Sequence, residues 1–170
     1  MSQEHRTEIA QLAIWTKKFL HPFQKLLNAS IQKISATVSD EMILSVFKYG
    51  TDKSSVILSI KKGDSGIYLS DIKPQTLQKP NSIVQITRKY LQGRRVENVF
   101  ATLSPICVVI ECFNKREETE DDKEINQGPD TLILNLDERP PKIVLAKKYT
   151  GVPERYKKKK KKNFQEHDIF

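Results

Sequence analysis

Basic side chains are the residues of this 170-residue chain whose types and spacing favour a chemical role. Four of them gather where a helical pattern stops at Gly93, namely Arg88, Lys89, Arg94 and Arg95. A helix carries partial negative charge at its C-terminal end, so cations are favoured there. The planar guanidinium of arginine and the ammonium of lysine bind phosphate oxygens but do not recognise individual bases. This cluster therefore predicts a surface that binds a nucleic-acid backbone. The alternative interpretation is a surface helix with a solvated basic face.

A second basic group lies near the end of the sequence. Between Lys142 and Lys162 the chain has ten Lys or Arg against one acid, a balance of +9 in a chain of net charge +8, so the remainder is almost neutral. The consecutive members are Lys157, Lys158, Lys159, Lys160, Lys161 and Lys162. This distribution predicts a domain over residues 1–150 and a basic, disordered tail over residues 151–170. The lysines are interpreted either as phosphate contacts or as a solubility device.

No combination of residues predicts catalysis. The sequence has no serine or cysteine nucleophile beside a histidine, no glycine loop for phosphate, and no paired carboxylates within an apolar pattern. His5, His21 and His167 are scattered, and with two cysteines they do not supply the ligands of a metal site. Cys107 and Cys112 are five residues apart in one expected strand, so they point to opposite faces and cannot bridge each other. We expect no enzyme activity, bound metal or cofactor.

Apolar residues recur at helical spacing in three segments. The first two, Ile9 to Leu20 and Pro22 to Leu27, predict N-terminal helices. The third predicts an internal helix that Ser82 caps, with Gln85 completing a capping box. Gly93 then supplies the left-handed residue after the last turn.

Period-two patterns separated by turn residues predict eight strands, at residues 34–38, 42–46, 56–60, 67–69, 96–101, 106–113, 131–136 and 143–146. An acidic segment between the sixth and seventh strands ends in strong turn residues, and it predicts a long, solvated hairpin loop. Its acids are Glu117, Glu118, Glu120, Asp121, Asp122 and Glu124. Strands paired through short turns, with helices at the edges, predict an α+β protein built on an antiparallel β-sandwich or flattened barrel.

The run RKYLQGRRVENV at residues 88–99 resembles the helix, glycine and arginine junction of the NFACT N-terminal domain. That domain occurs in fibronectin-binding protein A homologues and in factors of ribosome-associated quality control. Residues 26–34 are similar to the family's first helix-to-strand junction, although its two glycines and arginine are here Asn28, Ala29 and Ser30. The resemblance covers residues 10–148 in order. It implies a fold similar to the N-terminal domain of formamidopyrimidine-DNA glycosylases.

The same resemblance implies contact with transfer RNA and with RNA of the large ribosomal subunit. Some of the family's functional residues are absent, because its Asp-Arg pair falls on Pro105 and Ile106 and its N-terminal aspartate falls near Gln11. The proline nucleophile and adjacent glutamate of the glycosylases are replaced by Ser2 and Gln3. We therefore expect a non-catalytic RNA- or ribosome-binding module.

An alternative is a protein-protein interaction subunit that docks onto a separately encoded NFACT-type partner, with the tail serving only solubility. A third interpretation places the lysine run on an anionic membrane surface, where Phe164 and Phe170 offer only a thin apolar anchor. No apolar run approaches the roughly 20 residues that a membrane helix needs, and no signal sequence opens the chain. These features favour a cytoplasmic protein without membrane insertion.

Overall fold

The computed structural model describes residues 21–50, 53–70, 75–103 and 105–147. The helix expected at residues 9–20 and the tail expected at residues 151–170 lie outside these ranges. The division of the chain at residue 150 therefore stays a prediction.

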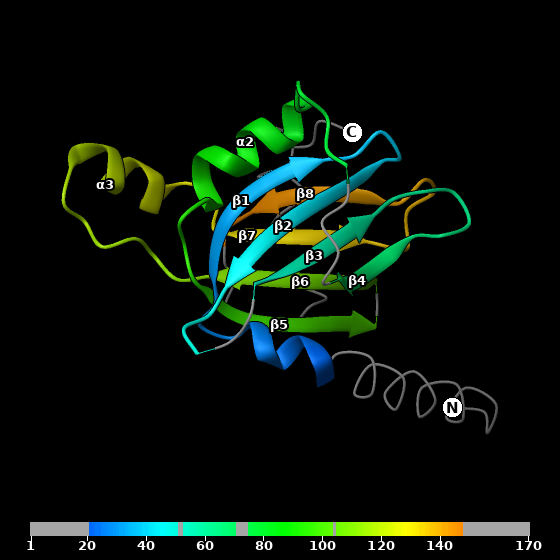
Figure 1. Ribbon diagram of the computed structural model, residues 1–170, viewed down its shortest axis with the longest axis horizontal. Coiled ribbons are helices and arrows are strands. Elements are labelled where there is room, and N and C mark those ends of the chain that lie inside the picture. Colours follow the sequence, from blue (N-terminus) through cyan, green and yellow to red (C-terminus); the bar gives the residue numbers. More distant parts are fainter. Residues whose placement is uncertain (1–20, 51–52, 71–74, 104, 148–170) are drawn as a thin grey trace.

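Eight described strands form two four-stranded sheets in which neighbours are antiparallel (Figure 1). The first sheet consists of β1 (Ser30–Ala36), β2 (Glu41–Phe47), β3 (Ser54–Ser59) and β4 (Gly66–Ser70). The second consists of β5 (Val96–Leu103), β6 (Ile106–Cys112), β7 (Thr131–Asn135) and β8 (Lys142–Ala146). In both sheets the spatial order follows the chain order. The predicted α+β class with antiparallel sheets is confirmed.

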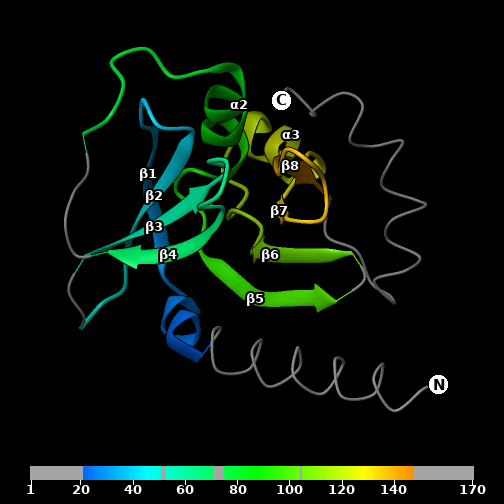
Figure 2. The same cartoon turned by 90° about the vertical axis from the view of Figure 1, so that its right-hand side faces the viewer.

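The two sheets bury their inner faces in one shared core. Met42 and Leu44 of β2 lie in the same cluster of buried side chains as Val108 and Ile110 of β6. Burying an aliphatic side chain of this kind contributes about 1.5–3 kcal/mol, so the shared cluster stabilises both sheets together. Figure 2 shows the sheets side by side around this core.

An isolated bridge between Ser30 and Arg95 connects the first strand of one sheet to the beginning of the other. The neighbouring backbone bonds run from the Asn28 N–H to the Val96 carbonyl, 2.8 Å, and from the Val96 N–H to the Ala29 carbonyl, 2.9 Å. The two sheets therefore meet at one corner, and the start of β5 is fixed there.

The two cysteines lie on opposite faces of β6, as the odd spacing predicted. Cys112 belongs to the core between the sheets, whereas Cys107 packs with Val109 and Ile133 on the other face. Both thiols are buried. Burial raises the pKa of Cys112 to about 12, so this cysteine stays a neutral packing group.

The helix α2 (Ser82–Leu91) lies across one end of the two sheets, where it contacts β1 and β8 (Figure 1). Its buried residues are Ile83, Val84, Thr87 and Leu91. The N-cap is Asn81 rather than Ser82, because the Asn81 side chain accepts a hydrogen bond from the Val84 N–H at 3.2 Å. Gln85 does not close a capping box; its side chain donates to the carbonyl of the residue before the cap at 3.0 Å. The predicted helix is confirmed, with its cap one residue earlier.

The helix predicted at Pro22 to Leu27 is a short 3₁₀ helix, η1 (His21–Leu26), which packs against β5. Asn28 follows it with φ of +68°, a left-handed conformation that asparagine tolerates better than most residues. This turn directs the chain into β1, so the segment is too short for a regular α-helix.

The hairpin loop predicted for the acidic segment is wrong, because part of it forms a helix, α3 (Glu120–Gln127). Thr119 and Asp122 form a capping box: the Asp122 N–H donates to the Thr119 hydroxyl at 3.2 Å, and the Thr119 N–H donates to the Asp122 carboxylate at 3.0 Å. Hydrogen bonds lower the pKa of Asp122, and the one from the Glu118 N–H has the largest effect. Acids are also favoured in the first turn of a helix. No residue of α3 is fully buried, so local capping and charge placement contribute more to this helix than packing does.

Gly128 allows the end of α3 to pack against α2, because a Cβ at this position would overlap the Tyr90 ring. We expect Gly128→Ala to lower the free energy of unfolding by about 2 kcal/mol through overpacking. Urea denaturation followed by circular dichroism measures this change. Gln127→Ala, at the exposed neighbouring position, is the control and should change stability by less than about 0.5 kcal/mol. Wild-type stability of the Gly128 variant would show that the two helices do not pack in this way.

Candidate nucleic-acid interface

The site begins at Gly93, which ends α2 in the left-handed conformation that the sequence predicted, with φ of +85°. Its N–H donates to the Ile31 carbonyl of β1 at 2.7 Å. The next residue, Arg94, donates its backbone N–H to the Leu91 carbonyl at 3.1 Å. These bonds turn the chain from α2 directly towards β5, and they fix the backbone of both following arginines.

Arg94 points into the interior and is only 2% exposed. Its Nε donates to the Phe113 carbonyl at 2.7 Å, and its Nη2 donates to the Asn114 side-chain oxygen at 3.1 Å. Its Nη1 donates to the Tyr90 carbonyl at 3.2 Å and to the Pro129 carbonyl at 3.4 Å. All three nitrogens of the guanidinium therefore have partners inside the protein.

This burial excludes Arg94 from the surface that the sequence predicted. Burial lowers the pKa of Arg94, while the nearby charge of Asp130 acts in the opposite direction. A buried guanidinium that donates three hydrogen bonds to backbone carbonyls and one to the Asn114 side chain cannot also fork to a phosphate. Arg94 is a structural residue of this junction.

Arg88 and Lys89 are partly engaged within the protein. Arg88 is half-buried, and its Nε donates to the Ile34 carbonyl of β1 at 2.6 Å. The Lys89 ammonium lies 3.7 Å from the Glu124 carboxylate of α3 and 5.2 Å from the centre of the Tyr90 ring. An exposed ion pair of this kind contributes only about 0–1 kcal/mol, but it places an acid beside the lysine.

Arg95 is exposed, because successive residues of an extended segment point to opposite sides and Arg94 points inward. Its Cζ lies 5.6 Å from the centre of the Phe113 ring. The Arg95 carbonyl accepts a hydrogen bond from the Phe113 N–H at 2.9 Å. Arg95 forms no ion pair with any residue that the structure describes.

Lys115 joins this surface, although the sequence interpretation missed it. Its ammonium lies beside Gly93, 3.9 Å from the point that a Cβ of Gly93 would occupy. Asn126 fixes the Lys115 backbone, accepting from its N–H at 2.8 Å and donating to its carbonyl at 2.9 Å. We call Gly93, Arg95, Phe113 and Lys115 the Arg95 platform. Positions 113 and 115 share a face in an extended chain, so strand alternation could have indicated that they act together.

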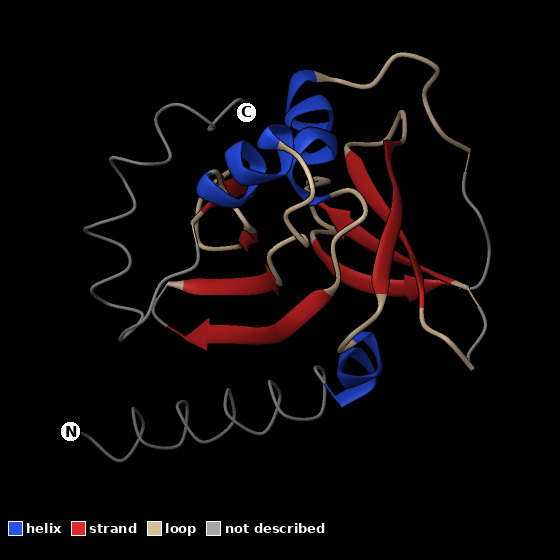
Figure 3. Cartoon of the chain, turned by 90° about the vertical axis from the view of Figure 1, so that its left-hand side faces the viewer, coloured by secondary structure: helices blue, strands red, loops and turns tan. Residues whose placement is uncertain are grey.

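The acidic helix α3 lies beside α2, close to this surface (Figure 3). Lys115 is close enough to Asp122 to help lower the pKa of that carboxyl group, and Lys89 is paired with Glu124. Among the cations predicted at the junction, Arg95 is therefore the one that stays exposed without an acidic partner in the described part of the chain.

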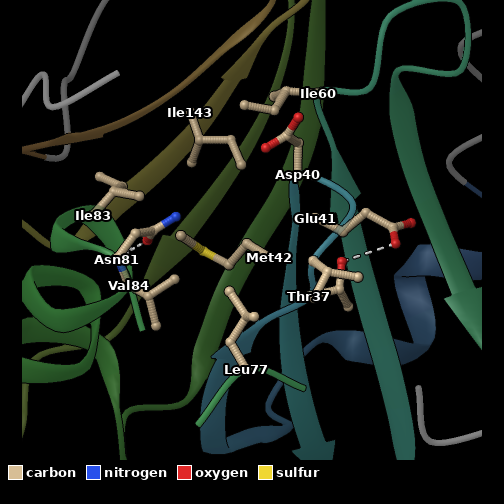
Figure 4. A pocket seen from close by; sticks show the side chains of 11 residues that line it. Thr37, Asp40, Glu41, Met42, Ile60, Leu77, Asn81, Ile83, Val84 and Ile143 are labelled. Carbon is tan, nitrogen blue, oxygen red and sulfur yellow. Dashed lines mark hydrogen bonds between the residues drawn. The ribbon is translucent and has the colours of Figure 1, made fainter. Parts of the chain in front are cut away.

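A separate cavity of about 280 Å³ lies between the β1–β2 turn, the start of α2 and β8 (Figure 4). Met42, Ile83 and Ile143 contribute apolar walls, and Asp40 lies at its edge. Val38, at the turn beside it, is 82% exposed. The lining therefore combines apolar side chains with the polar residues Thr37, Asp40, Glu41 and Asn81.

The structure adds two observations on the other predicted features. The described residues contain no group of three or more His, Cys, Asp or Glu arranged to hold a metal ion. No helix in these ranges is both long and apolar enough to cross a bilayer. The six predicted lysines, residues 157–162, lie outside the described residues, so their role stays a prediction.

The chain has two antiparallel sheets, and a turn of glycine and arginine connects a helix to the second sheet. This is the fold of the NFACT N-terminal domain, as the sequence predicted. In particular, the N-terminal domain of fibronectin-binding protein PavA from Streptococcus pneumoniae matches with a TM-score of 0.61 and 24% identity, over 79% of this chain and 50% of that one. The N-terminal region of the fibronectin/fibrinogen-binding protein FBPS from Streptococcus suis matches with a TM-score of 0.59 and 24% identity, over 72% and 43%. The fibrinogen-binding protein from Staphylococcus aureus matches with a TM-score of 0.57 and 19% identity, over 81% and 50%.

The chain thus spans about half the length of these structures, and the similarity is one of fold. No protein-family model matches the sequence, and no curated protein sequence matches it either.

The contrast between the two adjacent arginines gives a direct test. We expect Arg94→Lys to lower the free energy of unfolding by about 3 kcal/mol, because lysine leaves several buried carbonyls unsatisfied and each costs roughly 1–3 kcal/mol. Arg95→Lys makes the same chemical change at the exposed neighbour and should alter stability by less than about 0.5 kcal/mol. Urea denaturation of both variants provides the comparison. Equal losses would contradict the assignment of Arg94 to the interior.

Proposed function

We propose that this chain is a non-catalytic RNA- or ribosome-binding module that contacts phosphates through Arg95 and Lys115. The observation that carries this proposal is that Arg95 is exposed and that neither Arg95 nor Lys115, whose ammonium lies beside Gly93, forms an ion pair with any described residue. By contrast, Lys89 is paired with Glu124 and Arg94 is buried. The platform cations are thus available to an external anion.

The proposed targets are transfer RNA or RNA of the large ribosomal subunit, in the cytoplasm. The family resemblance supports these targets, although the family's Asp-Arg pair is replaced by Pro105 and Ile106. Pro105 is buried and its carbonyl accepts a hydrogen bond from the Thr102 hydroxyl at 2.6 Å, so this position serves the hairpin between β5 and β6. RNA contact in this chain would therefore rest on the Arg95 platform and the lysine tail.

The proposed mechanism is electrostatic. An arginine can fork to two phosphate oxygens, whereas a lysine acts as a point charge on a flexible stem. Contacts of both kinds position a nucleic acid but read little of its sequence. The tail would add affinity without fixing a geometry, and the platform would supply the fixed part of the interface.

The tail contribution follows from counterion release. If residues 157–162 neutralise about six phosphates, the log-log slope of RNA affinity against salt concentration should be about −4 to −5. Fluorescence anisotropy with a labelled transfer RNA measures this slope for the full chain and for a chain truncated after Tyr156. The truncation should flatten the slope. Identical affinity and slope for both proteins would exclude a role of the tail lysines in binding.

The cavity beside α2 favours a second candidate function, a subunit that docks onto a separately encoded NFACT-type partner. Exposed Val38 next to apolar walls suits an apolar side chain of the partner. Asp40 and Glu41 at the edge suit a neighbouring basic residue. In this case the lysine tail would serve only solubility.

Val38→Asp tests the docking function, because the substitution places a charge at the cavity without disturbing a buried residue. A protein complex that survives nuclease treatment and high salt, and that Val38→Asp abolishes, would support this function over RNA binding. Tyr49→Asp is the control, since Tyr49 is 96% exposed in a different turn. Size-exclusion chromatography of the purified complex is the measurement. Loss of the complex with both variants, or with neither, would contradict docking at this cavity.

A further inference from the structure

The Arg95 platform combines an exposed planar cation, Arg95, with a half-buried aromatic ring, Phe113, and a half-buried second cation, Lys115. The Arg95 guanidinium lies over the Phe113 ring, with 5.6 Å between Cζ and the ring centre. Lys115 follows Phe113 by two residues, and its ammonium lies 3.9 Å from the point that a Cβ of Gly93 would occupy, so the missing side chain of Gly93 leaves room beside it. Nucleobases stack on aromatic rings and on guanidinium planes, and lysine binds the adjoining phosphate.

The backbone under these side chains is held in place before any ligand arrives. The Phe113 N–H donates to the Arg95 carbonyl at 2.9 Å, and the Gly93 N–H donates to the Ile31 carbonyl at 2.7 Å. Asn126 makes two hydrogen bonds to the Lys115 backbone. Groups that are already positioned lose less conformational entropy on binding, so geometry should matter here as well as charge.

We propose that the Arg95 platform stacks one unpaired nucleobase, which makes single-stranded or looped RNA its substrate class. This inference rests on the proposed RNA-binding function and goes further, because phosphate contacts alone do not distinguish a loop from a duplex. A base within a duplex is already stacked on its neighbours and cannot reach the platform, whereas a base in a loop can be splayed out. Lys89 over Tyr90 is a second cation and ring pair at this junction, but its ammonium is paired with Glu124.

The experiment compares two fluorescein-labelled probes, a single-stranded oligouridine and a blunt RNA duplex of equal length. Both are titrated with the full chain, and with a full-length variant in which the six tail lysines, residues 157–162, are glutamine. Arg95→Lys keeps the charge but removes the plane that stacks. It should weaken binding of the single strand about tenfold, within the range for loss of one stacked base, and leave duplex binding unchanged.

Arg139→Lys is the matched control, because it makes the same substitution at another exposed arginine. It should alter neither probe. Phe113→Leu keeps apolar bulk below Arg95 but removes the aromatic ring, and it should reproduce the effect of Arg95→Lys, with circular dichroism verifying the fold. A single-stranded probe that carries 2-aminopurine reports stacking directly, since its fluorescence should change on binding to the parent protein and much less on binding to Arg95→Lys.

The outcomes separate this inference from the function on which it rests. Preference for the single strand that is lost in Arg95→Lys and retained in Arg139→Lys supports the stacking platform. Equal binding of both probes, with Arg95→Lys indistinguishable from Arg139→Lys, overturns the platform but leaves an electrostatic RNA-binding module. Absence of RNA binding by the full chain overturns both proposals, and isolation of a nuclease-resistant protein complex would then assign the surface to a protein partner.

Discussion

The buried guanidinium of Arg94 is the interaction on which the rest of this junction depends. It bonds to carbonyls from three separate parts of the chain: Tyr90 at the end of α2, Phe113 after β6 and Pro129 before β7. Unsatisfied carbonyls at this depth would cost free energy, and few side chains other than arginine have enough donors in a fixed plane to reach them all. The position of the helix, the hairpin strands and the following segment is therefore set by one side chain.

The buried contacts of Arg94 also fix the backbone of the exposed residue that follows it. Arg95 is attached to the same backbone, which also bridges to Ser30 of the first sheet. The two sheets share one core, so the corner at which they meet cannot shift without disturbing that core. The geometry of the candidate interface is thus coupled to the stability of the whole described domain, although its functional side chains contribute little packing themselves.

The strands could be predicted from the sequence because their signals are local. Alternating apolar residues and turn residues such as Gly50 and Asp40, both with positive φ in the structure, mark where each strand begins and ends. The net charge of the acidic segment does not indicate helix α3, because its Thr119 and Asp122 capping box depends on the positions of two residues and on their specific hydrogen bonds.

The candidate site was only partly predictable. Side chains alternate in direction along an extended segment, and Val96 is buried, so Arg94 should be buried and Arg95 exposed. This signal is local to the sequence, but the charge of the cluster does not contain it. Phe113 and Lys115 reach the site through the register of β5 with β6, where Val96 pairs with Cys112. That register is a long-range property of the folded sheet, and a hydrophobic pattern within one strand does not contain it.

The acidic helix α3 also makes the electrostatic potential of the surface uneven, with negative potential on one side. Acids on α3 lie on one side of the junction, where Glu124 is paired with Lys89 and Asp122 is close to Lys115, whereas exposed Arg95 has no ion-pair partner among the described residues. A long polyanion approaching this region meets an attractive potential over the cations and a repulsive one over α3, so it is steered to leave the junction on the far side from that helix. Rising ionic strength shortens the reach of both potentials and removes this polarity of approach.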